Sequence, residues 1–249
     1  MNLIGHNYIA SKVLSRYNPL VAAGVYIPDL VPFLKSSVFT FEEIHENPDV
    51  VYQYCRKNDN ECVDLALGMM THSVKYGVDR YNKDIDEWLI GKDSKLGDEI
   101  AQKIVDCSGI PFETARGPRM HNYLWSGLDF YILSNFPEFA KQIQKAYSQV
   151  DIDKISKILS KAFKKDLNGV KGNLNDHIGL VNKNDITNPA GCISYWKDFL
   201  SQLSEQDNVN LEKAVSCISF ISEKFDKNWP EIIDKTTKDV KFNMSMVII

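Results

Sequence analysis

The 249-residue chain has no excess of basic residues and no long run of one charge sign. Its 29 Lys and Arg residues are balanced by 33 Asp and Glu residues, which gives a formal net charge of −4. Proteins that bind nucleic acid through its phosphates normally carry a basic surface. The composition therefore indicates no nucleic-acid partner.

The sequence also lacks an apolar run of the roughly 18 residues that a membrane-crossing helix needs. Its longest apolar stretches lie around residues 65–70 and 244–249. His6 and Asn7 stand where a secretory signal would need its apolar core, and no small-residue cleavage site follows them. These absences predict a cytoplasmic protein without a transmembrane segment.

Cysteine is scarce and shows no metal-binding pattern. An odd number of widely spread cysteines, without a Cys-x-x-Cys pair, indicates neither a disulfide framework nor a thiolate zinc site. We therefore expect free, buried thiols in a reducing compartment. The five residues are Cys55, Cys62, Cys107, Cys192 and Cys217.

Several hydrolase motifs are absent as well. There is no Gly-x-Ser-x-Gly sequence and no glycine-rich phosphate loop, which argues against nucleophile-based hydrolases. A zincin would need a second histidine four residues after His45, but Asp49 occupies that place and Pro48 interrupts the helix. The adjacent His-Asp pair of the HD phosphohydrolases is missing too, because residues 176–177 have the reverse order.

What the sequence does contain is helical periodicity, which predicts an all-α fold of one multi-helix domain. Asparagine and proline mark the helix starts, since the residue before a proline leaves the helical region. We expect a first helix from about residue 4 to 18, a short one up to 26, and further helices over 50–56, 62–79, 98–107, 119–134, 137–148, 153–163, 191–203, 209–225 and 230–237. Asn47-Pro48 is expected to cap the helix over 50–56. Residues 164–188 carry three glycines and little periodicity, which predicts a long surface loop with an exposed His177.

Histidine supplies the strongest chemical clue. Four of the five histidines, His6, His45, His72 and His121, lie in the first half of the chain beside apolar or rigid segments. Imidazoles and carboxylates are good ligands for zinc and similar divalent metals. His72 and Asp79 are seven residues apart on one expected helix and share a face, so they can ligate one metal. A hydrogen-bonded core histidine and a helix-end carboxylate remain the alternative.

Two further carboxylates are candidates. Asp29 stands between Pro28 and Pro32, which hold it at a rigid corner. Asp129 is eight residues after His121 on one expected helix, about 80° out of line, so the pair can reach a common site only from neighbouring edges. Taken singly, each carboxylate can also be a structural residue.

Five segments in the first half occur in an order that resembles the zinc-dependent phospholipase C and P1 nuclease superfamily, an all-helical metallohydrolase fold. They are residues 5–10 (GHNYIA), 23–30 (AGVYIPDL), His45, 67–72 (LGMMTH) and 120–124 (MHNYL). The Gly-x-x-x-Pro-Asp-Leu and Leu-Gly-x-x-Thr-His signatures carry most of the resemblance. It covers residues 3–133, and the C-terminal part adds nothing to it.

The resemblance implies one to three zinc ions, or other divalent transition metals. By this likeness His6 and Asp29 would hold one ion, with Asp29 as a candidate bridge. His45 and His72 would hold a second ion, and His121 would belong to a third.

The chain departs from the family at two places. The family commonly has Asp four residues after the helical histidine, where this chain has Tyr76, and we take Asp79 as the substitute. It commonly has Glu four residues after the later histidine, where this chain has Trp125, which leaves Asp129 as the candidate carboxylate. One metal position can therefore be weak or empty.

The implied function is a metal-dependent phosphoesterase that hydrolyses a small phosphoester through a metal-bound hydroxide. Asp29 is the candidate to orient or deprotonate the water. Arg116 and Arg119 are weaker candidates for binding the phosphate, with solvated loop charges as the alternative. The departures at Tyr76 and Trp125 favour a second hypothesis, a non-catalytic helical binding or scaffold protein that has lost part of the metal site.

The sequence thus predicts two regions of one domain. Residues 1–163 form the metal-binding helical core, and residues 164–249 form the long loop and the C-terminal helices packed on it.

Overall fold

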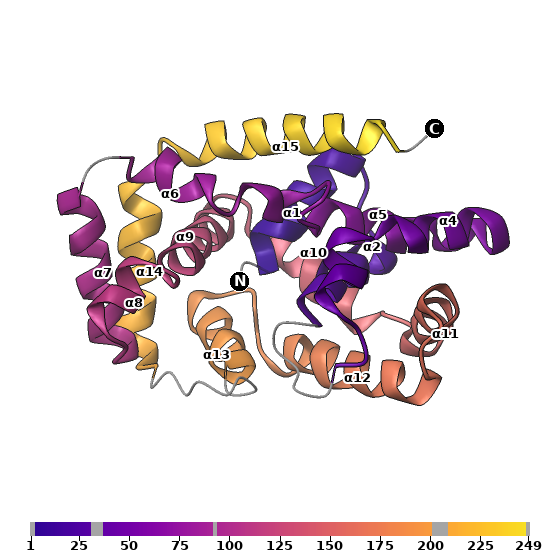
Figure 1. Ribbon diagram of the computed structural model, residues 1–249. Coiled ribbons are helices and arrows are strands. Elements are labelled where there is room, and N and C mark those ends of the chain that lie inside the picture. The colour runs from indigo at the N-terminus through magenta and orange to yellow at the C-terminus, as the bar shows by residue number, and fades with distance from the viewer. Residues whose placement is uncertain (1–2, 31–36, 92–93, 201–208, 248–249) are drawn as a thin grey trace.

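A computed structural model of the protein describes residues 3–30, 37–91, 94–200 and 209–247. These residues form helices joined by turns, without a strand among them, so the all-α prediction is confirmed (Figure 1). The α-helices are α1 Leu3–Leu14, α2 Pro19–Tyr26, α4 Asp49–Asn58, α5 Val63–His72, α6 Asp84–Leu89, α7 Ser94–Ser108, α8 Phe112–Arg116, α9 Met120–Asn135, α10 Pro137–Ser148, α11 Ile152–Phe163, α12 Leu167–Lys183, α13 Pro189–Leu200, α14 Leu211–Lys224 and α15 Trp229–Ser245. Shorter helical turns are η1 Ile27–Asp29, η2 Glu42–Glu46, η3 Asn60–Cys62 and η4 Val78–Tyr81.

The start of α2 follows the sequence signals. The Asn18 side chain accepts hydrogen bonds from the main-chain N–H groups of Leu20 and Val21, each at 3.0 Å. Pro19 occupies the first helical position, where its missing N–H costs nothing. The predicted break between the first two helices is therefore confirmed.

Several other predicted boundaries are wrong. The first helix ends at Leu14 and not near 18, and the last one continues to Ser245 and not to 237. Helix α5 ends at His72 and not at 79, because the backbone of Ser73 turns to an extended ψ of 156°. Asn47 does not cap α4 with its side chain, which instead donates to the Glu42 carbonyl at 3.2 Å. With Asn47 as the cap, Pro48 would be the first residue of the helix, but the helix begins one residue later, at Asp49.

The predicted loop over 164–188 is also wrong, because α12 occupies most of it. Buried Val170, Leu174, Ile178 and Val181 recur at spacings of four, four and three residues, which is a helical pattern. The glycines and asparagines between them obscure that pattern in the sequence. His177 lies on this helix and has no exposed surface, contrary to the prediction.

Helices α2 and α5 cross in close contact where Gly24 meets Gly68. A side chain at either glycine would collide with the main chain of the opposite helix. Because both positions lack a Cβ, the two backbones approach closely enough for side chains to reach across. Gly24 and Gly68 belong to the two signatures found in the sequence, and this contact is the physical reason for glycine there.

The C-terminal helices pack onto the same body as the N-terminal ones. Helix α14 packs against α9, and α15 runs along one side of the molecule against α1 (Figure 1). None of the described helices combines the length and the apolar character needed to cross a bilayer. All five cysteines are free thiols, and only Cys192 is more than slightly exposed.

Candidate metal centre

Five of the seven residues predicted to ligate metal lie together at the centre of the molecule. They come from five separate elements. Four of them are buried, and the side chain of the fifth, Asp79, is 13% exposed. They are His6 on α1, Asp29 in η1, His45 in η2, His72 at the end of α5 and Asp79 in η4.

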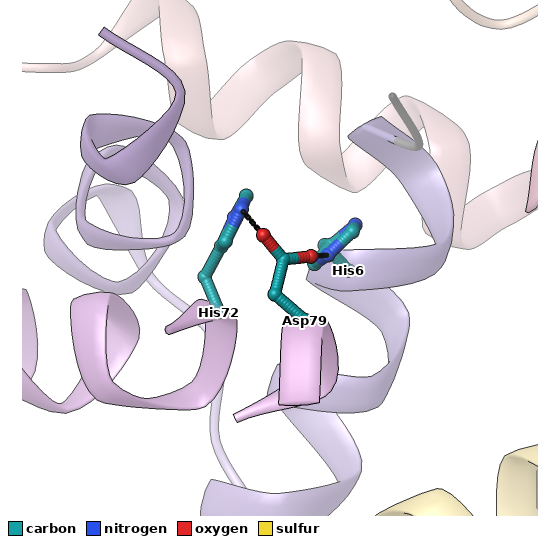
Figure 2. Close-up of side chains that lie close together, drawn as sticks. All are labelled: His6, His72 and Asp79. Atoms are coloured by element: carbon teal, nitrogen blue, oxygen red, sulfur yellow. Dashed lines mark hydrogen bonds and ion pairs between the residues drawn. The ribbon is translucent and has the colours of Figure 1, made fainter. Parts of the chain in front are cut away.

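Asp79 lies at the centre of this cluster (Figure 2). Its Oδ1 atom is 3.0 Å from Nε2 of His6, and its Oδ2 atom is 3.2 Å from Nε2 of His72. The Nδ1 atom of His45 is 3.6 Å from the same Oδ2 atom. One carboxylate therefore faces three imidazoles, and its two oxygens point to different ones.

The orientation of His72 follows from the close approach of α2 and α5. Its Nδ1–H donates a 2.6 Å hydrogen bond to the main-chain carbonyl of Val25 on α2. The other nitrogen, Nε2, then faces the carboxylates of Asp79 and, at 3.7 Å, Asp29. A histidine whose Nδ1–H is held by a carbonyl presents Nε2 in the orientation that metal-binding histidines commonly have.

Burial and charge shift the pKa values in this cluster in opposite directions. Burial alone lowers the pKa of His72, but the adjacent carboxylates of Asp79 and Asp29 raise it to about 9. Burial raises the pKa of the Asp79 carboxyl, but His72 and His6 hold it well below its usual range. The pKa of Asp29 is raised, chiefly because the carboxyl is buried. Without a metal, the cluster is thus held by an ion pair between His72 and Asp79.

His45 is the least satisfied member of the cluster. Neither of its buried ring nitrogens makes a hydrogen bond of good geometry with the described residues, although the main chain of Pro28 interacts with the ring. Burial lowers the pKa of this imidazole to about 4, so it is neutral near pH 7. The exposed ring of Phe41 stacks on it at 4.4 Å between centroids. A neutral imidazole has one ring nitrogen with a lone pair, and a buried one is suited to ligate a cation.

The donor set and its spacing fit a divalent transition metal. The ligand atoms of His6, His72 and Asp79 all lie within 4.8 Å of one another. With metal–nitrogen bonds near 2.0–2.1 Å, neighbouring ligand atoms of a tetrahedral zinc site are about 3.3 Å apart. The distances of 3.0, 3.2 and 3.6 Å from Asp79 lie near that value. Nitrogen and oxygen donors without a thiolate suit zinc and its neighbours.

The other two predicted ligands, His121 and Asp129, make none of the contacts that join these five residues, although the charge of Asp79 acts on the pKa of His121. The compact His/Asp group found among the described residues does not include His121 or Asp129. His121 is half-buried on α9, and burial lowers its pKa to about 4. The carboxylate of Asp129 instead accepts a 2.7 Å hydrogen bond from the main-chain N–H of Gly5.

The two arginines and Tyr76 have structural partners. Arg116 pairs with Asp98 at 3.0 Å between Nε and Oδ1, and this contact links α8 to α7. Arg119 precedes α9, and its charge contributes to the lowered pKa of His121. The hydroxyl of Tyr76 donates to Asp49 at 3.2 Å. Phosphate binding by the arginines stays a prediction.

Helices from the C-terminal part of the chain pack behind the cluster. The family resemblance could not indicate this, because it covers residues 3–133 only. His177 stacks on Tyr26 with ring centroids 4.3 Å apart, directly before the η1 turn that carries Asp29. The hydroxyl of Tyr195 on α13 donates to that of Tyr26 at 2.5 Å. The helical spacing of apolar residues around His177 is the one signal in the sequence that could have revealed its burial.

No family model, no curated protein and no solved structure matches this chain.

Proposed function

We propose that this protein is a metal-dependent phosphoesterase, with zinc as the expected metal and a small phosphate ester as the substrate class. The observation that carries the proposal is the Asp79 carboxylate shared by three buried imidazoles, with Asp29 beside them. Buried groups of this kind are expensive to desolvate and usually serve a cation or a reaction.

Asp79 would hold the cations through both of its oxygens. Its Oδ1 atom faces His6, and its Oδ2 atom faces His72 and His45. A carboxylate that faces imidazoles on both sides suits a bridge between two ions, so in this proposal Asp79, rather than Asp29, would take that role. Two divalent cations in such a site activate a water and stabilise the attacking and leaving oxygens of a phosphoryl displacement.

Asp29 would orient the attacking water and accept its proton. Its Oδ1 atom lies 3.7 Å from Nε2 of His72, at the edge of the group rather than between the imidazoles. Its carboxyl is buried, which raises its pKa in the metal-free protein, and carboxylates are common general bases. Asp29 can therefore orient the attacking water and accept its proton.

The experiment that tests this proposal is hydrolysis of p-nitrophenyl phosphate and bis(p-nitrophenyl) phosphate by untagged protein reconstituted with zinc or manganese. We expect slow turnover that chelation abolishes. Asp29→Asn keeps the size of the side chain and removes its charge, so it should lower kcat by about 100-fold or more while the fold is retained. Asp153→Asn, an exposed carboxylate paired with Lys171, is the matched control and should leave turnover unchanged.

A second candidate is a non-catalytic helical binding or scaffold protein. Trp125, where the resembled family has a carboxylate, is buried with its ring 6.2 Å from the ring of His6 and offers no lone pair to a metal. Stoichiometric metal without hydrolysis of either ester would support this candidate. Turnover that survives thorough chelation would contradict both candidates.

A further inference from the structure

Helix α9 contacts the first turn of α1 through two residues on one of its faces. Trp125 and Asp129 are four residues apart, a spacing that places side chains on the same side of a helix. The ring of Trp125 lies beside His6, and Oδ1 of Asp129 accepts the N–H of Gly5 at 2.7 Å. The residue that follows Gly5 is His6, so α9 contacts α1 directly at the metal-ligand position.

The first turn of α1 makes a hydrogen bond to a residue from elsewhere in the fold. The first N–H groups of an α-helix have no acceptor within the helix. The described first turn of α1 contains no acidic residue that could cap it. Asp129 supplies an acceptor to the N–H of Gly5, and the main chains of Ile4 and Leu3 also interact with its carboxylate. The positive end of the helix dipole further favours an anion there.

The surroundings of Asp129 offer little room for a ligand. Its carboxyl is 7% exposed and borders a cavity of about 20 Å³, which has space for about one water molecule. The described residues that line this cavity include Ser126 and Tyr195 but no histidine. Burial accordingly raises the pKa of Asp129 to about 7. The carboxyl is thus committed to the end of α1.

We propose that Asp129 is a positioning residue of the metal centre, which holds the first turn of α1 so that His6 reaches Asp79. It acts through Gly5 and is not itself a metal ligand. The inference rests on the proposed function for its metal-binding readout. It replaces the expectation from the sequence that Asp129 ligates a metal with His121.

The physical link is the stiffness of a helical turn. His6 lies 3.0 Å from Asp79, and a hydrogen bond or metal bond tolerates displacements of only a few tenths of an ångström. If the Gly5 N–H loses its acceptor, the first turn of α1 can fray and carry His6 with it. Residues that orient a ligand in this way typically change metal affinity by about 10–100-fold when they are replaced.

The experiment compares zinc affinity, measured by competition with a chromophoric chelator, in four variants whose folding is checked by circular dichroism. Asp129→Asn keeps an acceptor oxygen and should bind zinc within about threefold of the wild type. Asp129→Leu and Asp129→Ala remove the acceptor and should weaken binding by about tenfold or more. Tyr123→Leu is the control, because this α9 residue packs against Trp196 and Cys107 from another face of the helix than Trp125 and Asp129, and it should leave the affinity unchanged.

Equal affinity in the wild type and Asp129→Leu would overturn the proposal. So would an Asp129→Asn variant as weak as Asp129→Leu, because the charge itself would then matter, as it does for a direct ligand. The imidazole ¹⁵N chemical shift of His6 can be measured without metal. Its signal is identified as the one that is missing from the spectrum of His6→Gln. In metal-free protein this shift should change in Asp129→Leu and not in Asp129→Asn, and an unchanged shift would overturn positioning. If the His6 shift changes in Asp129→Leu as expected but the wild type binds no zinc, the proposed function is contradicted and the positioning role is supported.

Discussion

The Oδ2 atom of Asp79 lies 3.2 Å from Nε2 of His72, although the two residues belong to different helical segments. Helix α5 ends at His72, and a turn over residues 73–77 brings the chain back so that η4 places Asp79 against the imidazole. The turn is held from the C-terminal helix α15, where the side-chain amide of Asn243 donates to the carbonyl of Tyr76 at 3.3 Å. The position of the central carboxylate therefore depends on the far end of the chain.

Replacing His72 by Ala should lower both metal content and thermal stability. A metal that binds only the folded state stabilises it, and at 100 times the dissociation constant the gain of about 2.7 kcal/mol raises Tm by about 5–10 °C. Elemental analysis of untagged protein, together with Tm values with and without chelator, measures both quantities. We expect chelation to lower the Tm of the wild type by this amount and to leave the Tm of His72→Ala unchanged.

The control for this prediction is His121→Ala, since His121 takes part in none of the contacts that join the five residues of the cluster. It should retain the metal content of the wild type. Well under one metal per chain in wild-type protein never exposed to chelator would contradict the prediction, and so would unchanged metal content in His72→Ala.

The stability of the metal-free protein should fall as the pH rises from about 7 to 9. In the folded state burial lowers the pKa of His72, but Asp79 and Asp29 more than offset this and raise it to about 9, above the ordinary value of 6.5. The stabilisation is complete below pH 6.5 and is lost as the pH passes through 9, because the folded state then no longer holds the extra proton. The loss should be on the order of 2–3 kcal/mol.

Urea unfolding of chelated protein at several pH values measures this dependence. His72→Gln cannot take up the proton, so its stability should be nearly constant over the same range. A wild type and a His72→Gln variant with parallel pH profiles would show that His72 does not hold the proton.

Gly68→Ala should destabilise the protein and weaken metal binding. A Cβ at Gly68 collides with the main chain of α2, so the helices must separate and strain the His72–Val25 hydrogen bond. Overpacking of this kind typically costs about 1–3 kcal/mol. Gly172→Ala is the control, because a Cβ there meets nothing within 4 Å and alanine favours the α12 helix by about 0.5–1 kcal/mol. Thermal unfolding and zinc titration of both variants check the prediction, which an unimpaired Gly68→Ala would contradict.

Trp125→Glu should increase the number of metal ions bound. A glutamate there stands four residues after His121, whose lowered pKa leaves its imidazole neutral and able to ligate, and this spacing brings two side chains together on a helix. Loss of the buried indole should cost about 3 kcal/mol or more. Trp125→Gln has the same length without the charge and should gain less metal. A folded Trp125→Glu variant with the metal content of the wild type would show that His121 does not form a further site.

Local signals in the sequence predict many of the helices and several of their ends. Pro137 starts α10 at the predicted residue, and Asn18-Pro19 separates α1 from α2 as expected. These signals work because caps and proline act through a few neighbouring residues. They failed over 164–188, where glycines and asparagines obscured the buried helical pattern of α12.

The sequence also identified the five residues of the cluster, but for Asp79 it did so with the wrong geometry. The spacing from His72 suggested one continuous helix, whereas the structure breaks that helix at Ser73 and returns Asp79 by a turn. The two geometries bring the same side chains together. What the cluster binds stays a prediction.

By itself, the sequence determined the all-α class, several of the helix limits, and which histidines and carboxylates had unusual surroundings. Those properties depend on local periodicity, capping and residue chemistry. Only the tertiary structure decided that Asp129 caps α1, that His177 is buried behind Tyr26, and that Asp79 rather than Asp29 lies among the imidazoles. Each of these contacts joins elements that are distant in the sequence or separated by a turn, and the packing of whole helices sets their distance, which local patterns do not encode.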